Sequence, residues 1–488
     1  MMEYLKLFWH FIATWYWLPL GLIILSTLVL ILVENGKPEK TIAWLMVIVF
    51  LPVVGVILYY FFGQKFKKDK YFKQLEERYS QQLEAKWPSI QTFIDQEFRL
   101  IADVDTELNA VFSYLFRTKN AIPTSNNAVK ILINGEQKFP LLFEDLRQAK
   151  DHIHLEYYIF EEDEVGTELL NLLVEKAKEG VEVRLIIDGF GSSKLAKRQK
   201  HYTNLGIQME VFLPVHFSSL ANSNYRNHRK IVVIDGAIGY VGGINISEKY
   251  SNPNRGELYW RDTSIRLAGD AVKMLQIQFW LHWQSIAQQD WALDTRYFPD
   301  TAEFVNKVPM SFAFSSPGNT APYNMEAMIL GISAAKKKIE LCTPYFIPTE
   351  SFKTALMIAV AKGVEVSLMI PKKGDSAVVQ AAMLSFLKPF VARGVRVFLY
   401  EKGFIHAKTI NIDDVLAFVG TTNLDSRSFL INFEVSALLV NEHLAGQLAE
   451  QFRIDQQDSA IFTFETWQNE SWYYKAFASV CRLMAPLL

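Results

Sequence analysis

The feature that most constrains the fold of this chain is an internal repeat. Segments of similar sequence recur in the same order at separations of 186, 183 and 178 residues. A repeat with a nearly constant separation indicates two copies of one structural unit. We therefore predict that the chain after about residue 120 consists of two copies of one domain. The matching segments are 149–160 and 335–346, 178–188 and 361–371, and 228–230 and 406–408.

Within each copy, apolar runs typical of strands alternate with runs of helical periodicity. In the first copy we expect strands at 129–133, 153–160 and 181–188, with helices at 139–149 and 166–179. Alternating strands and helices predict an α/β sandwich in which helices pack on a largely parallel sheet. Two such domains facing each other would place a shared site between them.

The first 64 residues have the composition of a transmembrane hairpin. Two stretches, Leu7–Val33 and Thr41–Gln64, contain no Asp, Glu, Lys or Arg. Each exceeds the roughly 20 apolar residues that a helix needs to cross a bilayer. A signal peptide is disfavoured, because the first stretch is too long and lacks a small-residue cleavage site. A buried hairpin of a soluble protein is also disfavoured, because soluble cores seldom contain uncharged runs this long.

A basic segment after the hairpin predicts its orientation. By the positive-inside rule, residues from Lys65 onward are expected in the cytoplasm. The predicted order is a hairpin at 1–64, a helical connector at 65–120, a first domain at 121–305 and a second domain at 306–488 with an amphipathic tail. The basic residues concerned are Lys65, Lys67, Lys68, Lys70, Lys73 and Arg78.

The net charge argues against a nucleic-acid binder, and the cysteine content argues against a disulfide framework or a Cys-based metal site. A formal net charge of −2 does not fit a nucleic-acid binder, which usually has a strongly basic domain. The two cysteines, Cys342 and Cys481, lie far apart in the sequence. Neither a disulfide framework nor a Cys-based metal site is therefore expected.

Each copy contains the same polar motif, with the pattern H-x-K-x4-D-x6-G-[GT]-x-N. Residues two apart on a strand share a face, so the His and the Lys of each motif point the same way. The Lys can hold phosphate oxygens and neutralise charge as it develops, while the His can act as nucleophile or proton carrier. The motif residues are His228, Lys230, Asp235, Gly243 and Asn245 in the first copy, and His406, Lys408, Asp413, Thr421 and Asn423 in the second.

Two such motifs in one chain resemble the HKD signature of the phospholipase D superfamily. Sequence outside the motifs is similar to that of bacterial cardiolipin synthases, so the resemblance extends over essentially the whole chain. The segments that carry this second resemblance are 37–44, 51–55, Tyr59, 62–63, 157–160, 343–346 and 482–488.

The resemblance implies roles for the two histidines. One His attacks phosphorus and forms a phosphohistidine, while the other protonates the leaving alcohol and later deprotonates the acceptor alcohol. By analogy His228 is the nucleophile and His406 the acid and base, although the near-symmetric motifs leave this order open. The resemblance also implies a carboxylate partner for each imidazole: Asp262 for His228, and Glu434, 28 residues after His406, for His406.

The remaining motif residues are expected to bind or orient the phosphoryl group or to support the motif. The resemblance implies that Lys230, Lys408, Asn245 and Asn423 bind phosphoryl oxygens. Gly243 and Thr421 are expected to bind or orient substrate. Asp235 and Asp413 belong to the signature, but their distance along the strand suggests that they hold the motif in place and transfer no proton. These six residues and the two lysines complete the site predicted from the sequence, together with the histidines and their carboxylates.

The function implied by the resemblance is phosphatidyl transfer from one phosphatidylglycerol to another, with release of glycerol. The chemistry requires no metal or organic cofactor, and the enzyme would lie in the bacterial inner membrane as a multi-pass protein with cytoplasmic catalytic domains. A phospholipase D or nuclease that uses water, and a transferase that uses another phospholipid or alcohol, remain alternatives. The hairpin argues against a nuclease, and the intact His and Lys residues argue against a catalytically inactive scaffold.

Three further patterns predict no separate site. His152 and His154 could be a metal pair, but they have no third ligand nearby, and a solvated strand edge is the preferred interpretation. Gly189 and Gly191 fit a turn after a strand. The aromatic-rich segment 462–488 fits an amphipathic helix at the membrane surface or at a domain interface.

Overall fold

The computed structural model describes residues 15, 17–33, 38–60, 77, 81, 106–214, 225–252, 258–287, 291–301, 303–304 and 307–483. The chain divides into two compact units: one holds the N-terminal helices and the other holds both sheets. The basic segment used to predict orientation and most of the expected connector lie outside the described residues.

Three helices are described in the N-terminal unit. They are α2 (Trp17–Val33), α3 (Pro38–Phe50) and α4 (Pro52–Leu58). The second apolar stretch is divided at Leu51, because Pro52 begins a new helix, a position that suits its fixed φ. Over the residues with a described placement, the structure contains no helix that combines the length and apolar character needed to cross a bilayer. The expected transmembrane hairpin is therefore not confirmed.

The first copy forms a seven-stranded sheet in the order β1-β8-β6-β5-β2-β3-β4. Only the β2–β3 and β3–β4 pairs are parallel, and the other four neighbouring pairs are antiparallel. The expectation of a largely parallel sheet is wrong, because strands joined by a tight hairpin, such as β5 and β6, run antiparallel. The strands are β1 (Asn127–Ile133), β2 (His152–Tyr157), β3 (Glu182–Asp188), β4 (Gln208–Phe212), β5 (Lys230–Ile234), β6 (Ile238–Gly242) and β8 (Thr263–Gly269).

The helices of the first copy cover both faces of this sheet. Leu142, Leu146, Leu169 and Leu173 project from α7 and α8 into one apolar core with β2 and β3. The expected strands and helices of this copy are confirmed to within a few residues. The helices are α7 (Asn134–Gln148), α8 (Glu164–Lys178), α9 (Ser193–Ala196), α10 (Gln199–Asn204), the 3-10 turns η3 (Glu248–Ser251) and η4 (Thr295–Tyr297), and α11 (Ala271–Ala287).

The second copy forms an eight-stranded sheet in the order β19-β13-β12-β10-β15-β16-β18-β9. Only β10–β12 and β12–β13 are parallel pairs, as in the first copy. The strands are β9 (Met310–Ser315), β10 (Lys338–Cys342), β12 (Glu365–Pro371), β13 (Arg396–Tyr400), β15 (Thr409–Ile412), β16 (Leu416–Gly420), β18 (Glu434–Val440) and β19 (Ser459–Phe462).

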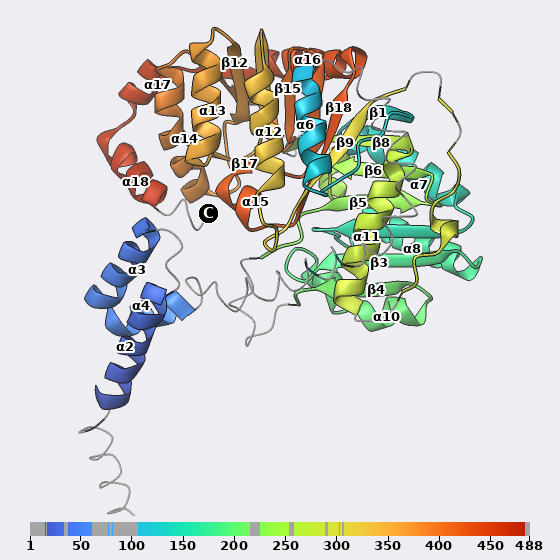
Figure 1. Cartoon of the computed structure of the whole chain (residues 1–488), viewed down its shortest axis with the longest axis horizontal. Helices are drawn as coiled ribbons and strands as arrows, with labels where there is room; N and C mark the ends of the chain where they lie inside the picture. Colours follow the sequence, from blue (N-terminus) through green and yellow to red (C-terminus); the bar gives the residue numbers. More distant parts are fainter. Residues whose placement is uncertain are drawn as a thin grey trace, which may run out of the picture. The chain divides into compact units, whose positions relative to one another are not determined.

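Helices α12, α13 and α14 lie over one face of the second sheet (Figure 1). Helix α18 packs its buried side, including Ala478 and Cys481, near α14. The helices are α6 (Thr106–Arg117), α12 (Tyr323–Ala334), α13 (Glu350–Ala361), α14 (Ala377–Val391), α15 (Ser426–Leu430), α16 (Glu442–Gln457), α17 (Phe464–Asn469) and α18 (Trp472–Leu483).

The two sheets meet through a shared apolar core. Val233 and Val241 of the first sheet lie in one buried cluster with Val419 and Val435 of the second. Four short strands add further pairing: β14 pairs with β7 across the two copies, and β11 pairs with β17. Their bounds are β7 (Tyr259–Arg261), β11 (Phe346–Ile347), β14 (Gly403–Ile405) and β17 (Leu424–Asp425). The two copies therefore form one body, and residues beside these short strands are brought together from both.

Asp235 and Asp413 hold equivalent turns in the two copies. Asp235 has a φ of 51° and its carboxylate accepts from the amides of Lys150, Asp151 and His152. Asp413 has a φ of 56° and accepts from the amides of residues 336, 337 and 338 in the same way. These contacts fit the supporting role expected for the two aspartates.

The solvated strand edge expected at His152 and His154 is wrong. Both side chains are fully buried, because β2 is an interior strand between β5 and β3. The His154 ring stacks on Phe279 with ring centroids 4.7 Å apart, and its Nδ1 lies 3.0 Å from Oε1 of Gln276. Burial lowers the pKa of His154 to about 4. The pair is part of an aromatic core.

Candidate active site

The two motif histidines lie where the copies meet. His228 lies two residues before β5, and its amide donates to the carbonyl of Phe433 in the second copy at 2.9 Å. His406 follows β14, and its amide donates to the carbonyl of Arg261 in the first copy at 2.7 Å. The two residues are only 9% and 8% exposed. Each histidine is thus held by backbone from the opposite copy.

Each imidazole also takes its carboxylate from the opposite copy. His228 Nδ1 lies 3.0 Å from Oε2 of Glu434, and His406 Nδ1 lies 2.7 Å from Oδ2 of Asp262. The pairing expected from the sequence, Asp262 with His228 and Glu434 with His406, is therefore wrong. The reason is the strand exchange: β7, which leads to Asp262, pairs with β14, which leads to His406.

The crossed contacts determine which nitrogen can react. An ionised carboxylate is an acceptor only, so Nδ1 of each neutral imidazole carries the proton and Nε2 keeps the lone pair. Burial alone would raise the pKa of Asp262 and of Glu434. The charge of Lys408 and the hydrogen bond from Nδ1 of His406 hold the pKa of Asp262 below its ordinary range, and the hydrogen bond from Nδ1 of His228 and the charge of Lys230 do the same for Glu434. Both carboxylates are therefore ionised at neutral pH.

The two carboxylates are supported differently at the equivalent motif positions. Thr421 donates its hydroxyl to Oε2 of Glu434 at 2.5 Å, and Asn432 donates its amide to Oε1 at 3.1 Å. At Gly243 an added Cβ would lie 2.2 Å from Oδ1 of Asp262, which is too close for any side chain. The glycine leaves room for the carboxylate where the second copy uses a hydroxyl to bind it.

The two motif lysines are almost fully buried beside the histidines. Lys230 Nζ donates to the carbonyl of His228 at 2.7 Å, and Lys408 makes the same contact with His406. Burial lowers the pKa of Lys230 well below its ordinary value and that of Lys408 to about 8. A bound phosphate would favour the charged form of both lysines, which burial disfavours, so the two side chains can serve as an anion site.

The imidazoles are neutral before substrate binds. Burial, with further effects from the lysine charges, lowers the pKa of His228 to about 4 and that of His406 to about 3. A bound phosphate diester adds a negative charge and favours protonation of a neighbouring imidazole. The centre therefore offers a neutral nucleophile before substrate binds and can hold a proton once it has bound.

The two motif asparagines differ in their contacts. Asn245 donates from Nδ2 to the Tyr250 hydroxyl at 2.7 Å, and its Oδ1 accepts from the amide of Ile159 at 3.2 Å. Asn423 is buried, and in the described part of the chain its Oδ1 has no hydrogen-bond partner. The Asn245 amide is therefore engaged at both ends, whereas the acceptor end of the Asn423 amide is not.

Several residues at the site lie outside the two sequence motifs and were not predicted. The Tyr158 ring lies 5.0 Å from the His228 ring, and the Trp260 ring lies 5.7 Å from the His406 ring. Lys138 of α7 is fully buried and donates to the carbonyl of Ile244 at 2.8 Å, between two motif positions. The repeat contains no second lysine at the equivalent position, so spacing alone could not identify it.

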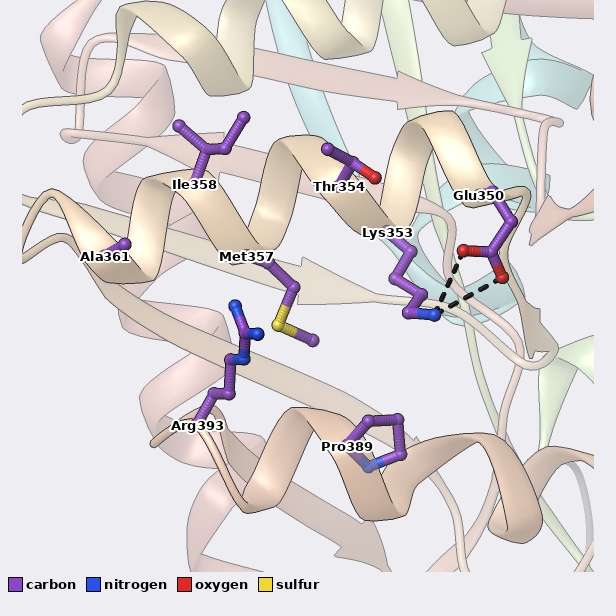
Figure 2. A pocket seen from close by; sticks show the side chains of 8 residues that line it. All are labelled: Glu350, Lys353, Thr354, Met357, Ile358, Ala361, Pro389 and Arg393. Carbon is purple, nitrogen blue, oxygen red and sulfur yellow. Dashed lines mark hydrogen bonds and ion pairs between the residues drawn. The ribbon is translucent and has the colours of Figure 1, made fainter.

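A groove elsewhere in the second copy is separate from the motifs. It lies between α13 and α14, has a volume of about 430 Å³ and contains no motif residue (Figure 2). Among the described residues, no group of three or more His, Cys, Asp or Glu side chains is placed to hold a metal ion. The groove is lined by Glu350, Lys353, Thr354, Met357, Ile358, Ala361, Pro389 and Arg393.

Comparison with known proteins identifies the family of the chain. A family model described as "Cardiolipin synthase, PLD-like domain" matches residues 142–280 and 328–456, and one described as "Phospholipase D-nuclease N-terminal" matches residues 21–64. A crystal structure of phosphatidylserine synthase from Haemophilus influenzae Rd KW20 has a similar fold, with a TM-score of 0.57 and 16% identity over 78% of this chain and 98% of that one. The fold and the paired motifs are those of the phospholipase D class.

Two relatives narrow the assignment within that class. The major cardiolipin synthase ClsA of Bacillus subtilis (strain 168) is 38% identical over 469 residues, which cover 95% of this chain and 97% of that protein. A cardiolipin synthase of Staphylococcus aureus (strain Mu50) is 37% identical over 475 residues, which cover 95% of this chain and 94% of that protein. The chain belongs to the cardiolipin synthase family.

Proposed function

We propose that the chain is a phosphatidyltransferase that makes cardiolipin from two molecules of phosphatidylglycerol and releases glycerol. The observation that carries the proposal is the crossed arrangement of the site. Two imidazoles, each oriented by a carboxylate from the opposite copy, are accompanied by two buried lysines. Such a centre can divide transfer between a phosphodiester and an alcohol into two displacements.

In the first displacement, Nε2 of His228 attacks the phosphorus of the donor lipid. A phosphorus–nitrogen bond forms and the bond from phosphorus to the glycerol oxygen breaks, while Nε2 of His406 gives its proton to that oxygen. Lys230 and Lys408 neutralise charge on the phosphoryl oxygens. Glu434 stabilises the positive charge that develops on His228, because its carboxylate accepts from Nδ1 of that ring.

In the second displacement, a hydroxyl of the acceptor phosphatidylglycerol attacks the phosphohistidine. His406 takes the hydroxyl proton, a new phosphorus–oxygen bond forms and the phosphorus–nitrogen bond breaks, which restores neutral His228. Asp262 keeps the His406 ring in one orientation during both proton transfers, through its contact with Nδ1. The sum is one cardiolipin and one glycerol from two phosphatidylglycerols.

Association with the lipid surface is also part of the proposal. The substrates are membrane lipids, so the centre must reach them at a bilayer. The N-terminal helices expose large apolar side chains such as Leu22, Val33 and Phe50. We propose that this apolar N-terminal segment keeps the enzyme at the bacterial cell membrane, with the catalytic body on the cytoplasmic side.

Product analysis tests the proposed reaction. Purified full-length protein is incubated in vesicles with phosphatidylglycerol labelled in its headgroup glycerol and in its acyl chains. Phosphatidyl transfer predicts acyl label in cardiolipin and one free labelled glycerol for each cardiolipin formed. Acyl label in phosphatidic acid, with no cardiolipin, would contradict the proposal and indicate a hydrolase.

A further inference from the structure

A third buried lysine lies directly behind the first-copy motif. The side chain of Lys138, on α7, is 1% exposed. Its Nζ donates to the carbonyl of Ile244 at 2.8 Å and lies 3.2 Å from the hydroxyl of Tyr157. Ile244 stands between Gly243 and Asn245, so the lysine holds the backbone of the turn that carries both motif residues.

This turn supports the His406 side of the centre. The Gly243 amide donates to the carbonyl of Thr263 at 2.9 Å, beside Asp262, and the space at Gly243 accommodates the Asp262 carboxylate. A shift of the turn by a few tenths of an ångström would press on Asp262 and so on the His406 ring that Asp262 orients. The position of Lys138 is thus connected to the acid and base of the proposed reaction by one turn of backbone.

The two copies differ at this position. The residue that corresponds to Lys138 in the repeat is Asn324, in α12. Asn324 is also buried, but its Nδ2 donates to the Ser315 hydroxyl at 2.9 Å. The second copy therefore has a neutral amide at this buried position, whereas the first copy has the amine of a lysine.

Keeping a lysine here is unfavourable for folding. Burial lowers the pKa of Lys138 to about 7, and only the charge of Asp262 opposes that effect. A buried amine that served packing alone would be replaced by an apolar side chain of similar volume without loss. The contact with Ile244 offers a reason to retain it.

We infer that Lys138 is a positioning residue of the catalytic centre, which fixes the Gly243–Asn245 turn and, through Asp262, the orientation of His406. The inference rests on the proposed phosphatidyl transfer. Loss of the side-chain donor should slow the proton transfers at His406 and leave lipid binding nearly intact.

The test compares Lys138→Met with Lys176→Met in the full-length protein. Lys176 is a matched control, because it is also a buried lysine of the first copy whose Nζ donates to a backbone carbonyl, that of Arg147, at 3.0 Å. Cardiolipin formation from phosphatidylglycerol vesicles gives kcat and KM, and thermal unfolding of each protein gives its midpoint. For Lys138→Met we expect kcat to fall at least tenfold, KM to stay within twofold and the midpoint to stay level or rise. Lys176→Met should keep its kcat.

The outcomes separate this inference from the proposed function. If the wild-type protein and Lys176→Met form cardiolipin and Lys138→Met has a wild-type kcat, the positioning role is wrong. If the wild-type protein forms no cardiolipin, the proposed function itself is wrong. If Lys138→Met fails to fold, Lys138→Arg is tested in its place, because the longer arginine side chain must displace the Ile244 carbonyl. A wild-type kcat in that protein would also overturn the inference.

Discussion

His228 Nδ1 lies 3.0 Å from Oε2 of Glu434, a residue 206 positions later in the chain and in the other copy of the repeat. His406 has the reciprocal relationship with Asp262. Neither copy therefore contains a complete catalytic pair, and the arrangement makes the reaction dependent on the docking of the two sheets.

The crossed pairing predicts different defects for two isosteric variants. Glu434→Gln should remove the orientation and charge support of His228, so that the phosphohistidine no longer forms at a measurable rate. Asp262→Asn should impair only His406, so that a donor with a good leaving group still labels the protein while turnover falls by roughly 10⁴-fold, the order seen when such a carboxylate is neutralised. Rapid-quench labelling measures both. If Glu434→Gln were labelled and Asp262→Asn were not, the result would contradict the crossed pairing and indicate that each histidine pairs with the carboxylate of its own copy.

Gly243 should not tolerate a methyl group. In Gly243→Ala the new Cβ would lie 2.2 Å from Oδ1 of Asp262, and the carboxylate would have to move away from His406. We expect kcat to fall by about 10²-fold, as displacements of about 1 Å can do, with little change in thermal stability. Thr421→Val is the informative comparison, because it removes a donor to Glu434 without adding volume. An unaltered kcat in Gly243→Ala would show that the reaction does not depend on the position of the Asp262 carboxylate.

The rate should fall as the pH rises. His406 must carry a proton to protonate the leaving glycerol, and before substrate binds its pKa is about 3, while that of Lys408 is about 8. Since kcat/KM reports groups of the free enzyme, it should decrease from low pH upward as His406 loses its proton. It should decrease more steeply above about pH 8, where Lys408 loses its charge. A profile of initial rates in vesicles measures this, and a constant kcat/KM from pH 7 to pH 10 would contradict it.

Asp235 and Asp413 should affect stability more than chemistry. Each carboxylate accepts from three backbone amides of the turn before β2 or β10. Asp235→Ala leaves these donors without their acceptor, at a cost of about 2 kcal/mol of unfolding free energy. Denaturant unfolding measures the loss, and kcat per folded molecule should stay within threefold. A large fall in kcat with unchanged stability would place Asp235 in the chemistry.

Much of this site could be predicted from the sequence, because its chemistry lies in short motifs. The spacing of His228 and Lys230, repeated at His406 and Lys408, was enough to predict an anion site shared by two copies, although each His lies just outside the strand that follows it. The partner of each histidine was not predictable in this way. Glu434 is nearer in sequence to His406, but β-pairing between β7 and β14 connects residues that are more than 140 positions apart.

The strand directions within the sheets and the role of Lys138 could not be predicted from the sequence, for a similar reason. An apolar run such as Ile231–Ile234 has the same composition in a parallel and in an antiparallel pair, and only the short β5–β6 hairpin decides between them. Lys138 stands among ordinary polar residues of an amphipathic helix, and its burial depends on the packing of α7 against the motif turn.

The most direct test of the whole account is the site of the covalent adduct. The protein is mixed with a donor lipid labelled in its phosphate, quenched in acid-free denaturant within the first turnover and digested, and the labelled peptide is identified by mass spectrometry. The account predicts the phosphatidyl group on the peptide that contains His228, in the wild-type protein and in His406→Ala with a good leaving group, and no label in His228→Ala. Label on the His406 peptide would reverse the two roles, and full turnover with no adduct on either histidine would contradict the two-step transfer.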